Sequence, residues 1–243
     1  MSAASDRHEK MVADALDNLG LVTASRPSVG TEYADVLIEE YNGKKVNTWL
    51  EVKMSHTDNL SNPRVFYRLG RWHTTYKTPA AKTAIDVLNG SPQAKQFVKD
   101  VATFANIDPS RVEIPTTKGG LRDPNAVPLD LMKAYFDQPG INRYIAKVEN
   151  FNMGKVVTLH YTIGKKEPAY YMQAGDDFYK ISRKNPLLLS NKIPVLSGMG
   201  EFKVRVATRS KFYEVQAEIK IMKMPNSSWS VLPDSRKNNP FII

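Results

Sequence analysis

The chain has 243 residues, enough for one large domain or two small ones with a substantial core. Its 34 Lys and Arg against 25 Asp and Glu give a formal net charge of +9, which favours a polyanionic partner such as nucleic acid. The sequence contains no cysteine, which excludes disulfides, thiolate metal sites and a cysteine nucleophile. No apolar run is long enough for a signal peptide or a membrane span, so we expect no membrane partner. The expected location is the cytoplasm of a bacterial cell or, for a phage-encoded protein, that of the host.

The first predicted helix places an acidic residue at the edge of the core. Asp6 and Glu9 have the spacing of a capping box, with Asp6 as the N-cap. Apolar residues between Val12 and Leu19 follow at helical spacing, and Gly20 is a helix stop. Glu9 shares the apolar stripe, where a carboxylate is costly unless a positive charge meets it. Glu9 therefore either caps its own helix or belongs to a site.

Two apolar strands are predicted next, at 34–38 and 46–53. An Asn-Gly pair at 42–43 lies between them and is a strong signal for a β-hairpin. On the second strand Glu51 and Lys53 share one face, because side chains alternate along a strand. The pattern therefore predicts a hairpin that presents an acid and a base together.

The register of this hairpin decides whether Asp35 can join them. A two-residue loop with regular pairing would set Asp35 opposite Leu50, on the wrong face for Glu51. A longer loop or a β-bulge would bring Asp35 opposite Glu51, because a shift of one residue exchanges the two faces of a strand. A site that contains both carboxylates therefore requires an irregular hairpin.

These residue types suit a divalent metal ion. Mg²⁺ prefers oxygen ligands, and one or two carboxylates with a substrate phosphate suffice to bind it. Asp35, Glu51 and the backbone carbonyl of Val52 would be the ligands, and Glu9 would act through a metal-bound water or a second ion. Lys53 would orient the attacking water or stabilise developing negative charge. The expected cofactor is Mg²⁺, with Mn²⁺ as a substitute.

Glu9, Asp35 and Glu51-Val52-Lys53 together resemble the signature of the PD-(D/E)XK nuclease superfamily. The first helix resembles that of archaeal-type Holliday-junction resolvases and Mrr-like restriction nucleases, in which it carries the first acidic residue and ends in Gly before a strand. Here 21–24 would be that strand and 28–30 the loop before Asp35. The resemblance implies an α/β (α+β) fold with a restriction-endonuclease-like core, a central mixed sheet flanked by helices. Ala34 precedes Asp35, where the signature has Pro.

The remaining elements divide the chain into two predicted parts. A helix-then-strand order up to residue 116 would complete the nuclease core, which we place at 1–117. We assign 118–243 to a β-rich extension for DNA recognition, dimerisation or both. The predicted helices are 79–88, 92–104 and 129–136, and the predicted strands are 111–114, 143–148, 155–161, 169–172, 202–206 and 212–220.

Basic residues in three segments are candidates for DNA binding. The stretch 64–77 interleaves them with aromatic residues, the loop 116–124 is basic and contains glycine, and the hairpin 202–220 places basic residues on one face. An ordinary solvated face explains the first and third segments equally well, and a linker explains the second. The candidates are Arg64, Arg68, Arg71, Lys77, Lys118, Arg122, Lys203, Arg205 and Arg209.

The basic, β-rich half beyond the predicted core is what an enzyme that reads duplex DNA needs. We therefore expect a Mg²⁺-dependent, sequence-specific double-stranded DNA endonuclease of the restriction or homing/phage-interference type, with Glu9, Asp35, Glu51 and Lys53 as catalytic residues. Cleavage of both strands favours a homodimer. The alternatives are a structure-selective nuclease, either a Holliday-junction resolvase or an exonuclease, and a non-catalytic DNA-binding module. A non-catalytic module that had kept only the nuclease fold would be expected to have lost one of the acidic residues or the lysine, and all four residues are present.

Overall fold

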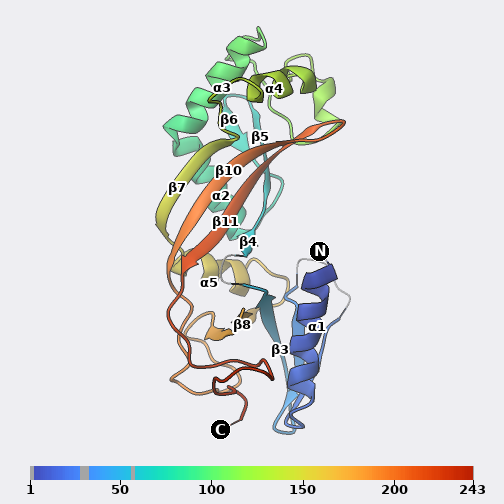
Figure 1. Cartoon of the computed structure of the whole chain (residues 1–243), viewed down its shortest axis with the longest axis vertical. Coiled ribbons are helices and arrows are strands. Elements are labelled where there is room, and N and C mark those ends of the chain that lie inside the picture. The colour runs from blue at the N-terminus through green and yellow to red at the C-terminus, as the bar shows by residue number, and fades with distance from the viewer. Residues whose placement is uncertain (1–2, 28–32, 56–57, 243) are drawn as a thin grey trace. The chain divides into compact units, whose positions relative to one another are not determined.

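The computed structural model describes residues 3–27, 33–55 and 58–242 (Figure 1). The predicted loop at 28–30 lies outside these residues. The chain forms two compact units. Unit 1 consists of Met1–Asp58, Asn152–Met199 and Ile221–Ile243, and unit 2 of Asn59–Phe151 and Gly200–Lys220. The protein is of the α+β class, with a mixed five-stranded sheet and helices in one unit and an antiparallel half-barrel sheet in the other.

Unit 1 is built on the mixed sheet, in which the strand order is β1-β2-β3-β8-β9. β3 pairs antiparallel with β2 and parallel with β8. A parallel pair needs a crossover connection, and here the chain leaves unit 1 after β3 and returns through helix α5. The elements are α1 (Ala3–Asp17), β1 (Val22–Ser25), β2 (Val36–Tyr41), β3 (Lys44–Lys53), α5 (Gly154–Thr162), β8 (Ala169–Ala174) and β9 (Asp177–Lys180).

The hairpin of β2 and β3 is irregular, as a site with both carboxylates requires. Its turn at 42–43 has two residues, but the register shifts by one within the hairpin. Two residues of β3, one of them Asn47 with a φ of 47°, oppose a single residue of β2. β2 consequently begins opposite Leu50, which places Asp35 opposite Glu51. The predicted irregular hairpin is confirmed.

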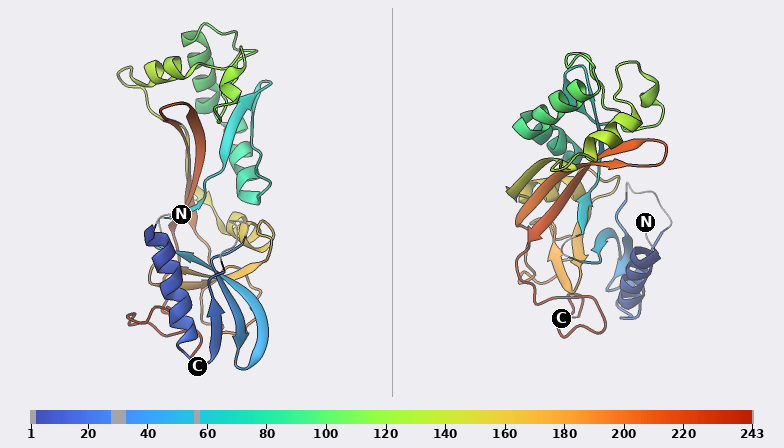
Figure 2. Two further views of the ribbon diagram at one scale, coloured as in Figure 1. Left: turned by 90° about the vertical axis from the view of Figure 1, so that its right-hand side faces the viewer. Right: turned by 45° about the horizontal axis from the view of Figure 1, so that its top comes forward.

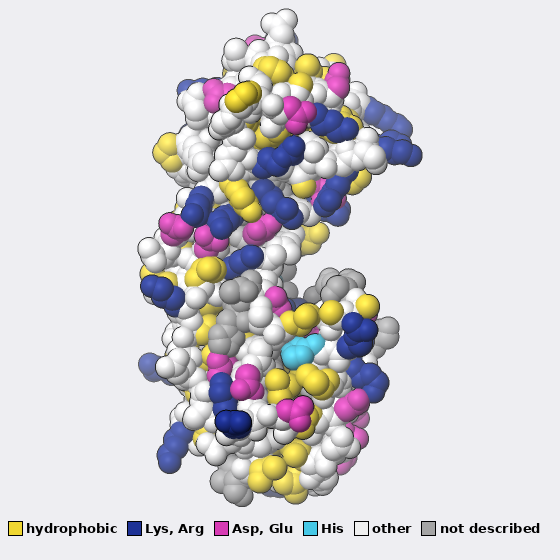
Figure 3. Space-filling view, in the orientation of Figure 1, with side chains coloured by type: hydrophobic (Ala, Val, Ile, Leu, Met, Phe, Trp, Pro, Cys, Tyr) yellow, Lys and Arg dark blue, Asp and Glu magenta, His cyan; other side chains and the backbone are white. Residues whose placement is uncertain are grey.

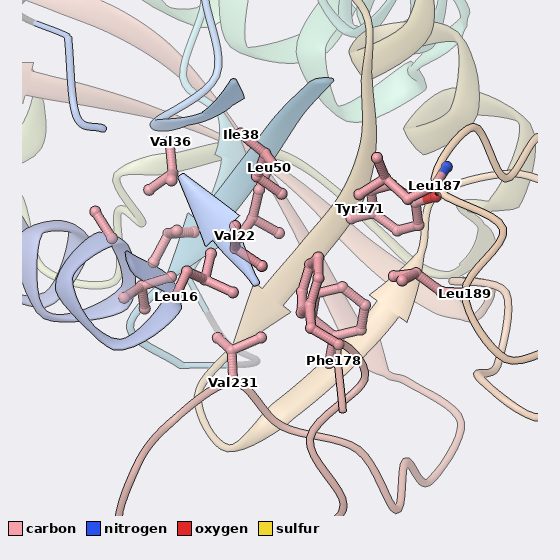
Figure 4. Close-up of a cluster of buried hydrophobic side chains, with 14 of the residues drawn as sticks. Leu16, Val22, Val36, Ile38, Leu50, Tyr171, Phe178, Leu187, Leu189 and Val231 are labelled. Atoms are coloured by element: carbon pink, nitrogen blue, oxygen red, sulfur yellow. Dashed lines mark hydrogen bonds between the residues drawn. The ribbon is translucent and has the colours of Figure 1, made fainter. Parts of the chain in front are cut away.

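The core of unit 1 separates the two faces of this hairpin. Leu16 of α1 packs with Ile38 and Leu50 of the sheet (Figure 4). Side chains alternate along β3, so Glu51 and Lys53 point to the face opposite Leu50. Apolar packing of α1 against one face therefore leaves the charged pair on the other.

The segment 155–161, predicted as a strand, is the helix α5, and that prediction is wrong. Its β-branched residues favour a strand. However, its buried residues are Val156, Val157, His160 and Tyr161, which lie one helical turn apart. Burial of this face outweighs the local preference.

The expected completion of the core is also wrong. The helices predicted at 79–88 and 92–104 do form, but they and 111–114 belong to unit 2. α5 and β8 instead continue the sheet beyond β3. The predicted boundary between 117 and 118 therefore does not match the compact units, since unit 2 draws on both sides of it. Local sequence signals predict a helix but not the sheet against which it packs.

Unit 2 holds the second sheet, with strand order β6-β5-β11-β10-β7 and β4 paired to β11 (Figure 2). Its two long helices begin as predicted, since Thr78 and Ser91 accept hydrogen bonds from backbone N–H groups in the first turns. No described helix is long and apolar enough to cross a membrane. The elements are β4 (Asn59–Ser61), β5 (Arg64–Arg68), β6 (Arg71–His73), α2 (Pro79–Gly90), α3 (Pro92–Phe104), the 3-10 helix η1 (Gly120–Arg122), α4 (Leu129–Phe136), β7 (Tyr144–Asn152), β10 (Met199–Thr208) and β11 (Tyr213–Lys223).

Candidate functional site

Asp35, Glu51 and Lys53 come together where β2 begins and β3 ends. Asp35 Oδ2 accepts a hydrogen bond of 2.8 Å from the backbone N–H of Val52. Lys53 Nζ donates to Glu51 Oε1 at 2.5 Å. The Glu51 side chain is 3% exposed and the Lys53 side chain 20% exposed, so the carboxylate of this ion pair is buried and the ammonium group is partly buried. The structure thus places three of the four predicted catalytic residues side by side.

Burial and charge set the protonation states of this group. Burial, followed by repulsion from the Glu51 carboxylate, raises the pKa of Asp35 to about 7. Burial also opposes ionisation of Glu51, but the ammonium groups of Lys53 and Lys165 outweigh it and hold the pKa of Glu51 below its ordinary value. Burial would lower the pKa of Lys53, yet Glu51 keeps it well above the usual value. A charged Glu51–Lys53 pair therefore lies beside a carboxyl group that takes up a proton near neutral pH.

Three residues at the end of α5 and just after it complete this group, and the sequence did not reveal them. Lys165 Nζ lies 3.5 Å from Glu51 Oε2, donates to the carbonyl of Tyr33 at 2.8 Å and is 5.7 Å from the ring centroid of Tyr161. Burial lowers the pKa of His160 to about 4, so its imidazole is neutral at pH 7. The helical spacing of the buried residues of α5 was the available signal.

Glu9 is buried, but partners already hold both of its oxygens. The Ser5 hydroxyl donates to Oε1 at 2.9 Å and Arg26 Nε donates to Oε2 at 2.7 Å. Arg26 also donates to Asp6 at 2.7 Å. α1 begins at Ala3, so Asp6 lies inside the helix and the predicted capping role is wrong. Arg26 supplies the positive charge that a buried Glu9 requires.

These contacts predict different metal affinities for two variants. Glu9→Gln should weaken Mn²⁺ binding less than Asp35→Asn does, because Arg26 neutralises Glu9, whereas Asp35 lies beside the Glu51 carboxylate. Titration of Mn²⁺ into each variant without DNA, followed by electron paramagnetic resonance, measures the two affinities. An equal or larger loss in Glu9→Gln would show that Glu9 binds the ion directly.

The donor types of Asp35 and Glu51 fit a hard divalent cation. No three acidic or histidine side chains gather into a metal cluster among the described residues, but Mg²⁺ needs only one or two carboxylates. Within the described part of the chain, the buried Glu51 Oε2 makes no hydrogen bond, although Lys165 Nζ lies 3.5 Å from it. Repulsion from Glu51 contributes to the raised pKa of Asp35, and a cation between the carboxylates would relieve it. Glu9 does not share this fit, because Arg26 and Ser5 occupy its oxygens.

Comparison with family models, curated proteins and solved structures finds no match. The chemistry of this chain's own residues therefore carries the functional conclusion.

All the candidate DNA-binding residues lie in unit 2. Five of them pair with acidic residues, and Figure 3 shows basic and acidic side chains next to each other over the sheet of this unit. The pairs are Arg64–Glu214 (3.3 Å), Arg209–Glu214 (3.5 Å), Arg68–Glu113 (3.0 Å), Lys203–Glu201 (2.6 Å) and Arg205–Glu218 (2.5 Å). Acidic neighbours thus accompany the candidate basic residues of β5 and β10, and Arg209 between β10 and β11.

The other four candidates are exposed and have no described carboxylate within 4.0 Å. Arg71 begins β6, at the turn after β5, and Lys77 follows β6. Lys118 and Arg122 lie in the loop that contains η1. These four side chains are therefore the candidates best placed to bind phosphate groups.

Proposed function

We propose that the protein is a metal-dependent nuclease whose active site consists of Asp35, Glu51, the Val52 carbonyl and Lys53. The β-bulge carries this proposal. Without the shift, Asp35 would lie opposite Leu50 and face the apolar core; with it, two carboxylates and a lysine share one buried group. A mixed sheet with α1 and α5 agrees with the fold that the resemblance to PD-(D/E)XK nucleases implies.

Each residue has a role that follows from its contacts. Asp35, Glu51 and the Val52 carbonyl would hold Mg²⁺, which when bound polarises a phosphoryl oxygen and lowers the pKa of a bound water. Lys53 Nζ, held by Glu51, presents a compact positive charge that stabilises negative charge developing on the phosphate. Lys165 is a positioning residue, because it lies beside the second oxygen of Glu51 while it binds the Tyr33 carbonyl.

Double-stranded DNA is the substrate that the rest of the chain supports. The net charge of +9 and the exposed basic residues of unit 2 favour a nucleic acid. A second unit of this size also offers surface for reading base edges, so we propose sequence-specific cleavage. Cleavage of both strands of a duplex favours a two-fold homodimer, which we propose as the active form.

Digestion of a long linear DNA tests the substrate class. With Mg²⁺, we expect discrete bands that disappear in EDTA and in the Glu51→Gln variant. A smear would retain the site but remove the sequence specificity. Cleavage of branched DNA alone would indicate a structure-selective nuclease. DNA binding without cleavage of any of these substrates would indicate a binding module and would contradict the proposal.

A further inference from the structure

The β5–β6 hairpin ends in a turn whose first residue does not suit its conformation. Leu69 and Gly70 form a two-residue turn with φ values of 51° and 75°. Turns with positive φ at both positions favour Asn-Gly, and a leucine is sterically disfavoured in this region. Leu69 nevertheless occupies the first position of this turn, and it is 82% exposed. An apolar residue thus lies in water in a conformation that asparagine would adopt more easily.

The two arginines that flank this turn also destabilise the hairpin by charge repulsion. Arg68 and Arg71 pair directly across the two strands, and like charges in that position repel. Arg68 is bound by Glu113 at 3.0 Å, whereas Arg71 has no described carboxylate within 4.0 Å. Among the described residues, the uncompensated charge at the tip of the hairpin is therefore that of Arg71, beside an exposed apolar side chain, and an anionic ligand at Arg71 would relieve the repulsion.

The hairpin behind the tip is held firmly, which excludes a loose surface loop. Trp72 is buried, its backbone N–H donates to Asn89 Oδ1 at 2.8 Å, and its carbonyl accepts from Asn89 Nδ2 at 3.2 Å. Tyr67 exchanges two backbone hydrogen bonds of 3.0 Å with Ile114. The hairpin is the cyan ribbon in Figure 2. Local conflicts concentrated at one exposed point of a rigid element are typical of a functional site.

We propose that Leu69 is a wedge that inserts between adjacent base pairs of double-stranded DNA, with Arg71 bound to a phosphate beside it. Apolar side chains used in this way partly unstack a base step and kink the duplex, while arginines bind the backbone. A protein or membrane surface would require a larger apolar patch than a single leucine between two arginines. The inference rests on the proposed function only in taking DNA as the ligand, and it does not depend on the metal site.

The Leu69→Asn variant separates the wedge from the fold of the hairpin. Asparagine suits the left-handed turn, so we expect a Tm at or above that of the wild type. Unwinding is measured by relaxing closed circular plasmid DNA with a metal-independent topoisomerase in EDTA, with the full-length protein bound and then removed. The wild type should change the linking number of the plasmid, and Leu69→Asn should lose that change. Arg71→Gln should instead weaken binding, with a salt-dependence slope smaller by about 1.

Leu188 provides a matched control. It is 85% exposed and has a φ of 54°, so Leu188→Asn should shift Tm in the same direction while unwinding stays at the wild-type level. Unwinding that persists in Leu69→Asn would overturn the wedge, as would wild-type binding without unwinding. Cleavage without unwinding would support the proposed nuclease function and contradict the proposed wedge. Unwinding without cleavage would support the wedge and contradict the nuclease function. Failure to bind DNA at all would overturn both.

Discussion

Replacing Lys53 with Met is expected to slow phosphodiester cleavage by about 10²–10³-fold, the usual cost of removing one group that stabilises transition-state charge. Lys53 Nζ lies 2.5 Å from Glu51 Oε1, closer than Lys165 Nζ, which lies 3.5 Å from Glu51 Oε2. Lys220 offers a matched control, because it is the lysine of a second Glu-x-Lys motif, Glu218-Ile219-Lys220, which lies on β11 in unit 2. Lys220→Met should therefore retain the wild-type rate in a single-turnover assay with saturating Mg²⁺.

The same variant should also lose stability, and a second substitution separates the two effects. Removing one partner of a buried ion pair typically costs about 3–5 kcal/mol, because the other charge stays buried. Lys165 lies near Glu51 and should reduce that loss. The double variant Glu51→Gln with Lys53→Met removes both charges and should recover most of the stability without recovering cleavage. Urea unfolding and the cleavage assay on the same three samples measure this. A double variant that regains activity would show that the ion pair is structural only.

The elements that the sequence predicted correctly are those with local signals. α3 begins after Ser91 because that side chain accepts a hydrogen bond from Ala94 N–H, three residues away. α4 likewise has the predicted bounds. The local strand preference of 155–161 was wrong because its neighbours, which are distant in sequence, bury one helical face. The division into units depends on strand pairs such as β3 with β8, which are formed between segments more than a hundred residues apart and have no local signal.

The candidate site divides in the same way. Alternation along one strand is enough to place Glu51 beside Lys53. The same period of two shows that Asp35 can join them only through a register shift, which the hairpin contains. Lys165 and His160 were not predicted, because each reaches the site from a part of the chain that is distant in sequence.

Asp35→Asn is expected to stabilise the metal-free protein at neutral pH while it abolishes cleavage. In the folded protein the pKa of Asp35 is about 7, against an ordinary value of 3.8. Between these values the folded state binds more protons than the unfolded state, so the contribution of Asp35 to stability falls as pH rises and is constant above the folded pKa. Three pKa units at about 1.4 kcal/mol each correspond to a loss on the order of 4 kcal/mol.

His160 acts in the opposite direction over part of this range, so the difference between the two proteins is the quantity to measure. Its folded pKa is about 4, below the ordinary 6.5, and the unfolded state therefore binds more protons between these values. Its contribution to stability rises with pH over that range and partly hides the fall due to Asp35. Unfolding free energies of the wild type and of Asp35→Asn, measured by urea in EDTA from pH 4 to 8, cancel the histidine. Their difference should grow in favour of Asp35→Asn up to about pH 7 and then stay constant, because beyond the folded pKa no further proton is lost.

Adding Mn²⁺ should reverse the order of the two proteins at pH 7, since a cation bound by Asp35 and Glu51 favours the ionised carboxylate. A difference that is independent of pH and of Mn²⁺ would mean that the two carboxylates do not interact and would remove the physical basis of the proposed metal site.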